Sequence, residues 1–78
     1  MRLSVLSQVP PGRAVRIVEN GCESGLSRRL EDLGMIPGTV VQCVHKSPAG
    51  SPAAYNIQGA IIALRKGDAE KIWVEDAP

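Results

Sequence analysis

The stretch "RRLEDLGMIPG", residues 28–38, decides the fold, because a helix ends and a strand is launched within it. Gly34 supplies the left-handed residue that commonly ends a helix. In the Schellman arrangement the next residue, Met35, folds its side chain back on the last helical turn, which gives Met35 a structural role. Pro37 and Gly38 suit the two corners of a type II turn. The stretch therefore predicts a helix end, a cap and a tight turn into a strand.

A helix of about three turns is expected before this cap. Ser24 is a suitable N-cap residue. Leu26, Leu30 and Leu33 follow at spacings of four and three, which places them on one stripe of the helix.

The remaining segments alternate apolar and polar residues, as half-buried strands do. Turn-forming residues separate them, and the Pro- and Gly-rich segment 47–52 indicates an exposed loop. Five short strands with one inserted helix predict a mainly β fold, a small and partly open barrel. Ile72 and Val74 are expected to point inward and Trp73 outward. The predicted strands are 14–19, 39–46, 53–58, 60–65 and 71–75, with a helical turn over 66–70.

Length and composition limit the possible functions. A chain of 78 residues forms one small domain, which we place over residues 1–78. With 9 Lys and Arg against 8 Asp and Glu, the net charge of +1 produces no field that concentrates polyanions, so nucleic acid is not an expected partner. One Trp, one Tyr and no Phe leave no aromatic platform for stacking bases.

The sequence gives no sign of membrane insertion or export. No stretch approaches the roughly 18 apolar residues of a spanning helix, and the segment 1–6 is too short for a signal peptide. We therefore expect a cytoplasmic location. Cys22 and Cys43 are then expected to be free thiols, because that compartment is reducing.

One specific motif is the R-L-x-x-L-G-M-x-P-G run of residues 29–38, and a second is the G-x-x-I-A-L-R run of residues 59–65. Together they resemble the FeoA family, the small cytoplasmic companions of the ferrous iron transporter FeoB. The similarity extends over about residues 5–75. The same type of domain is similar to the C-terminal SH3-like module of iron-dependent transcriptional repressors.

The resemblance implies an SH3-like barrel of five antiparallel strands and no catalytic residue. It implies a role in bacterial ferrous iron uptake, with the cytoplasmic region of FeoB as partner. The leading hypothesis is an accessory protein that docks on FeoB and modulates transport. The alternative is a stand-alone metal-responsive regulatory module similar to the repressor domain. Self-association is left open.

Neither an enzyme nor a cofactor site is expected from the motifs. His45 is the only histidine, and it lacks the local context of a nucleophile elbow. No glycine-rich phosphate loop is present in the sequence. Cys43 and His45 are two residues apart on one predicted strand, so they are expected to share a face as weak metal-ligand candidates. Two ligands are too few for a closed site, and the preferred interpretation is that Cys43 is a small core residue and His45 a polar residue at the end of the strand.

The candidate partner-binding residues are Arg28, Arg29, Met35, Ile36 and Trp73. The two arginines form either a solvated charged face or the rim of an interaction patch. Ile36 has no role in the helix cap, which makes it a better candidate than Met35. Trp73 either anchors a partner or covers an open end of the barrel.

The charged residues near the end of the predicted helix lead to a further expectation. Glu31 and Asp32 lie in the last turn, where acidic groups meet the negative end of the helix dipole. Pairs between Arg28 and these acids are expected to offset part of that cost.

Overall fold

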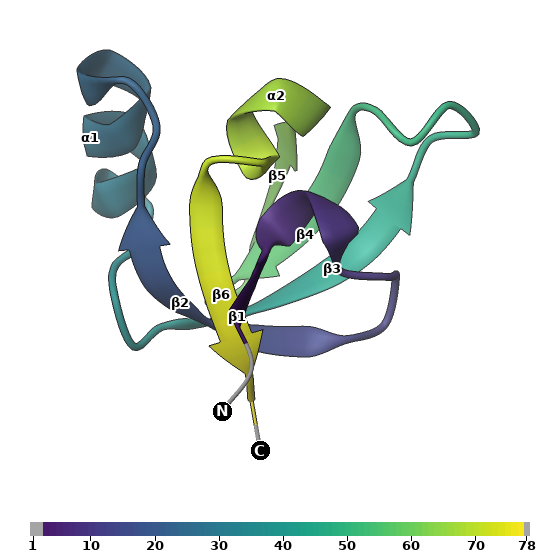
Figure 1. The fold of residues 1–78 in the computed structure, drawn as a ribbon, viewed down its shortest axis with the longest axis horizontal. Coiled ribbons are helices and arrows are strands. Elements are labelled where there is room, and N and C mark those ends of the chain that lie inside the picture. The colour runs from purple at the N-terminus through teal and green to yellow at the C-terminus, as the bar shows by residue number, and fades with distance from the viewer. Residues whose placement is uncertain (1–2, 78) are drawn as a thin grey trace.

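The chain folds as a strongly bent antiparallel sheet with one main helix at its side (Figure 1). The computed structural model describes residues 3–77. Met1 and Arg2, which belong to the segment 1–6 considered above as a signal peptide, lie outside the described residues. The strand order is β1-β6-β2-β3-β4-β5, so β1 and β5 are the two edges and the barrel is not closed. The elements are β1 (Leu3–Val5), η1 (Leu6–Gln8), β2 (Ala14–Asn20), α1 (Ser24–Asp32), β3 (Val40–Lys46), β4 (Ala53–Ile57), β5 (Ala60–Leu64), α2 (Lys66–Ala69) and β6 (Ile72–Asp76).

The predicted fold class is confirmed, but the predicted number of strands is wrong. All five expected strands are present, and the described residues add a sixth, β1. Its three residues pair with β6, with Leu3 opposite Glu75 and Val5 opposite Trp73. So short a segment shows no periodicity of its own, because its conformation depends on a partner strand at the other end of the chain.

Helix α1 begins with a different cap from the one predicted. Glu23 is the N-cap residue, and its carboxylate accepts hydrogen bonds from the backbone N–H of Leu26 at 2.7 Å and of Gly25 at 3.2 Å. Ser24 is the first residue of the helix and not its cap. The negative charge of this carboxylate is also stabilised by the positive end of the helix dipole.

The end of α1 is the predicted Schellman motif. The N–H of Met35 donates to the carbonyl of Leu30 at 2.9 Å, and the N–H of Gly34 donates to the carbonyl of Glu31 at 2.9 Å. Gly34 has a φ of 102°, and a Cβ there would lie 2.7 Å from Oε1 of Gln58. The positive φ favours glycine at this position, whereas the exposed end of the Gln58 side chain can move away from a Cβ.

The predicted turn after the cap is also confirmed. Gly38 has a φ of 94°, and the N–H of Thr39 donates to the carbonyl of Ile36 at 3.1 Å. These values are those of a type II turn with Pro37 at its first corner. The turn delivers the chain directly into β3.

The core lies inside the bent sheet and is built mainly from aliphatic side chains. Tyr55 of β4 is its largest buried residue, and its hydroxyl donates a long hydrogen bond of 3.5 Å to the carbonyl of Leu6. Burial raises the pKa of Tyr55 to about 12. As predicted, Ile72 and Val74 are buried and Trp73 is exposed.

Strand β3 contains a β-bulge that changes which side chains share a face. Cys43 pairs with Tyr55, whereas His45 pairs with Ala54, so one extra residue, Val44, lies between the two pairs. Cys43 is buried inside the sheet, and His45 is exposed. The prediction that Cys43 and His45 share a face is therefore wrong.

Candidate functional site

The candidate site is a cleft between helix α1 and the edge strand β5, which we call the α1–β5 cleft. Its volume is about 300 Å³. It exists because only one residue of α1, Leu30, is buried in the core, while β5 has no further strand beside it in the described chain. It is lined by Leu26, Arg29, Leu30, Leu33, Ile62, Ala63, Leu64, Arg65 and Asp68.

The floor of the α1–β5 cleft is apolar. Leu30 and Leu64 are buried, and Leu26 and Ile62 are partly buried against the core. Leu33, at the end of α1, is 44% exposed, so the leucine stripe is only partly covered by the core. The stripe lines the cleft, which leaves apolar surface open to solvent.

The rim of the cleft carries two arginines and one acid, namely Arg29, Arg65 and Asp68. Within residues 3–77 the structure contains a single ion pair, between Arg16 and Glu75 at 3.5 Å. Both rim arginines are exposed, and among the described residues neither lies within 4 Å of a carboxylate. The cleft presents an apolar floor below free guanidinium groups.

The partner-binding residues predicted in and around α1 occupy three different environments. Arg29 lines the α1–β5 cleft, whereas Arg28 is exposed and does not line it. Met35 is fully buried, with 0% exposure, so its side chain belongs to the core and offers no surface. Ile36 is 46% exposed in the turn after the helix.

Trp73 lies apart from the cleft. It is 44% exposed on the outer face of β6, with Val5 on one neighbouring strand and Glu19 on the other in register. The structure therefore brings only Arg29 of the five predicted residues into the cleft.

The ion pairs expected for Arg28 are not formed. No carboxylate of Glu31 or Asp32 lies within 4 Å of its guanidinium in the described chain. The Arg28 side chain is exposed to solvent.

Several cleft residues were not predicted from the sequence. The sequence places Ile62, Leu64 and Arg65 in the second motif and in a strand, and Asp68 in the next helical turn, without connecting them to a site. Their common role depends on β5 being an edge strand that faces α1, which is a long-range property. The one available signal was the absence of Pro, Lys or another charged residue from the strand segment AIIAL.

The two cysteines are free, as expected, and the structure buries both of them. Burial raises the pKa of each thiol. Sγ of Cys22 donates to the carbonyl of Asp68 at 3.4 Å. Among residues 3–77 no three His, Cys, Asp or Glu side chains are grouped as a metal site requires. The bulge also turns His45 away from Cys43.

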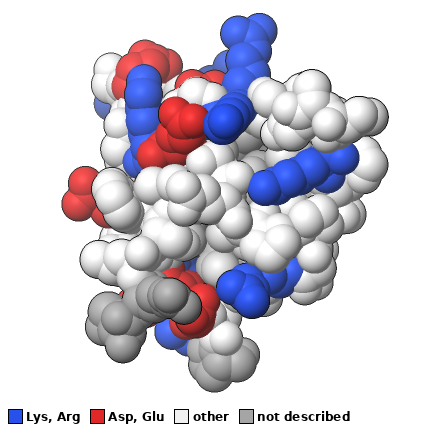
Figure 2. All heavy atoms as spheres, turned by 45° about the vertical axis from the view of Figure 1, so that its right-hand side comes forward, with Lys and Arg blue, Asp and Glu red and all other residues white. Residues whose placement is uncertain are grey.

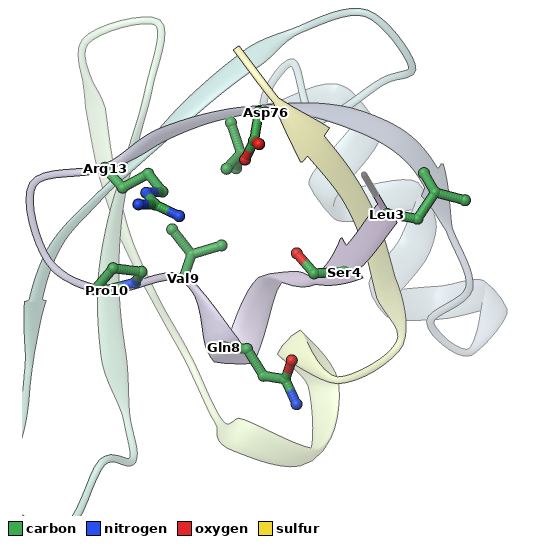
Figure 3. A pocket seen from close by; sticks show the side chains of 8 residues that line it. Leu3, Ser4, Gln8, Val9, Pro10, Arg13 and Asp76 are labelled. Carbon is green, nitrogen blue, oxygen red and sulfur yellow. The ribbon is translucent and has the colours of Figure 1, made fainter. Parts of the chain in front are cut away.

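A second hollow, of about 320 Å³, lies near the ends of β1 and β6 (Figure 3). Arg13 and Val9 point into it from one side and Asp76 from the other. Arg13 and Asp76 are not within ion-pair distance. One basic and one acidic group over a small apolar floor do not define a ligand class, so the α1–β5 cleft is the better candidate.

Charge is mixed over the face of the molecule shown in Figure 2. Lys and Arg side chains are scattered, acidic side chains lie directly beside some of them, and uncharged areas lie between these groups. The described residues on this face therefore form no continuous basic area of the kind that follows a polyanion. In addition, none of the helices within residues 3–77 has the length and apolarity needed to cross a membrane.

Comparison with known proteins places this arrangement in a family. The model of the FeoA domain matches residues 5–76. A comparison with curated protein sequences finds no match. The solution structure of the FeoA protein from Chlorobium tepidum superposes with a TM-score of 0.90 and 28% sequence identity, covering 95% of this chain and 70% of that one.

Two further solved structures extend the comparison. FeoA from Stenotrophomonas maltophilia, described as a prokaryotic SH3 domain protein complexed with zinc, gives a TM-score of 0.81 at 27% identity, covering 91% of this chain and 88% of that one. A manganese-dependent transcriptional repressor gives a TM-score of 0.83 at 14% identity, covering 96% of this chain and 42% of that one. The likeness to the repressor is one of fold alone.

Proposed function

Because this chain belongs to the FeoA family, which is linked to ferrous iron transport, we propose that it is a cytoplasmic accessory protein of bacterial ferrous iron uptake. In this proposal it docks on the cytoplasmic region of FeoB and modulates transport. It acts by binding and carries out no chemistry of its own. The structure of a Stenotrophomonas maltophilia relative is described in terms of activation of ferrous iron transport, which supports the assignment of the pathway.

The observation that carries the proposed docking is the α1–β5 cleft. A small domain gains stability by covering apolar side chains, yet here Leu33 remains exposed above the apolar floor. Exposed apolar surface with an arginine-bearing rim is typical of protein interaction sites. Arg29 and Arg65 supply that rim.

Arg28, Ile36 and Trp73 are proposed as additional contacts outside the cleft. Ile36 and Trp73 are each close to half exposed, and both are large enough to fill a pocket on a partner. Met35 is excluded from the proposed surface because it is buried.

The test of the proposed function is iron uptake by cells that contain intact FeoB, with and without this chain. We expect uptake to change when the chain is removed and to be restored by the wild-type chain. Purified chain should also capture the cytoplasmic region of FeoB. Identical uptake in both strains would contradict the proposal.

A second candidate is a metal-responsive regulatory module, favoured by the likeness of fold to the repressor. It requires metal affinity without FeoB. The placement of Cys43 and His45 on opposite faces argues against this pair as ligands. Anaerobic titration with Fe²⁺ and Zn²⁺ separates the candidates, since stoichiometric binding by the isolated chain supports the regulatory module.

A further inference from the structure

Strand β5 is paired on one side only. It is the last strand of the sheet, and its sole neighbour is β4. The hairpin between them turns through Gln58, with a φ of 51°, and Gly59, with a φ of 90°. These values are those of a two-residue type I′ turn, in which the residues that flank the turn form a hydrogen-bonded pair.

The register of this hairpin fixes which backbone groups are free. Ile57 opposite Ala60 is the hydrogen-bonded pair next to the turn, and such pairs alternate along antiparallel strands. The N–H and C=O groups of Ile61 and Ala63 therefore point away from β4. In the described chain they meet no other strand.

The edge of β5 also lacks the usual protection. Natural edge strands are blunted by Lys, Pro, a bulge or a covering element. The sequence of β5, AIIAL, has no charge and no Pro, its register with β4 is regular, and Ile61 is 59% exposed. The α1–β5 cleft runs beside this edge, so an apolar floor and free backbone groups lie next to each other.

We propose that the α1–β5 cleft binds an extended segment of a partner protein, in which apolar and acidic residues alternate, as an added strand on β5. The apolar side chains pack on the cleft floor, and the backbone pairs with Ile61 and Ala63. The acidic side chains meet Arg29 and Arg65. This inference specifies the chemistry of the segment recognised by the docking surface, and to that extent it rests on the proposed function.

Charge selects this occupant over a second copy of the chain. The rim carries two cations, Arg29 and Arg65, against one acid, Asp68, and neither arginine has an ion-pair partner in residues 3–77. A second copy that adds its own β5 brings no acidic residue within Ala60–Leu64. An extended acidic segment supplies both the strand and the missing counter-charges.

The probe for a test is a fluorescently labelled peptide of alternating Val and Glu. Two matched peptides serve as controls: one alternates Val and Lys, and the other keeps Val and Glu but is N-methylated along its backbone. Binding is followed by anisotropy, and amide hydrogen exchange is followed at Ile61 and Ala63. We expect the Val and Glu peptide to bind and to slow exchange at both amides, while the N-methylated peptide binds about tenfold more weakly.

Variants of the chain test the same contacts from the other side. Ala63→Pro removes an N–H that faces outward, which an edge strand tolerates, and should weaken peptide binding about tenfold. The double variant Arg29→Glu with Arg65→Glu should weaken it about fivefold. Arg13→Glu changes charge in the same sense outside the cleft and should leave binding unchanged.

Three results would overturn the inference: no binding of the Val and Glu peptide, equal binding of its N-methylated form, or dimerisation through β5 that the peptide does not displace. The N-methylated peptide is tested on the wild-type chain, so the test of backbone pairing does not depend on whether Ala63→Pro folds. Capture of the cytoplasmic region of FeoB separates the two proposals. If FeoB binds the wild-type and Ala63→Pro chains equally, the inference fails and the proposed function stands. If the peptide binds and FeoB does not, the proposed function fails and the inference stands.

Discussion

The two edge strands of the sheet, β1 and β5, differ in length and in what surrounds them. β1 is three residues long and continues directly into η1, where Leu6 turns into the core and is fully buried. β5 is five residues long and apolar, and it faces the α1–β5 cleft with nothing paired to its outer edge. One edge is short and followed by a core residue, whereas the other is long and left accessible. The difference indicates that residues near β1 stabilise the fold and that residues near β5 are available for a partner.

The comparison predicts unequal effects of the same substitution at the two edges. Leu6→Ala, beside β1, should lower the free energy of unfolding by about 2 to 5 kcal/mol, because it creates a cavity in the core. Leu33→Ala, in the cleft, should lower it by no more than about 0.5 kcal/mol, because the side chain is already exposed. Urea denaturation of both variants measures the two values. Equal losses would show that the cleft is part of the core.

The free energy of unfolding should depend on pH through Tyr55 of β4, which contacts Leu6 next to β1. The pKa of Tyr55 is raised to about 12 from an ordinary value of 10 by burial, and its hydroxyl donates to Leu6. A raised pKa contributes stability that is complete below pH 10 and is lost as the pH rises toward 12. The loss should be about 2 to 3 kcal/mol. Denaturation between these pH values measures it, and Tyr55→Phe, which cannot ionise, should remove this part of the slope.

A smaller effect is expected at the wall of the cleft. Glu23→Ala removes the side-chain cap of α1 and should cost about 1 kcal/mol. Glu31→Ala removes the same type of side chain from an exposed position at the other end of the helix and serves as the control. Thermal unfolding of both variants tests the expectation. A loss for Glu31→Ala as large as for Glu23→Ala would argue against a specific capping role.

A small stability effect is also expected at Trp73, on the outer face next to β1. Trp73→Ala should lower the free energy of unfolding by less than about 1 kcal/mol, because almost half of the side chain is exposed. Capture of the cytoplasmic region of FeoB should decrease if Trp73 is a contact. A large fall in melting temperature would instead assign Trp73 to packing over the sheet.

Local features could be predicted from the sequence, and long-range features could not. The Schellman cap and the type II turn depend on Gly34, Pro37 and Gly38, whose backbone preferences act within a few residues. β1 was missed because three residues have no pattern without β6. The predicted orientation of the His45 side chain was wrong because the β-bulge before it depends on how β3 pairs with β4.

The candidate site shows the same limit. Arg29 was identified from its place on the helix, but its neighbours in the cleft come from β5 and the segment that follows it. Only the strand order shows that β5 is an edge facing α1. The adjacent residues Met35 and Ile36 were separated correctly in their fold roles, because the helix cap assigns one of them to the interior.

The most direct test of the account is a map of backbone amide signals of the chain during titration with the cytoplasmic region of FeoB. The account predicts saturable changes grouped on α1 and β5 around the cleft, with a second group at Trp73 and no change at the buried Leu6. Changes confined to the β1 side, or no change at any ratio, would contradict it.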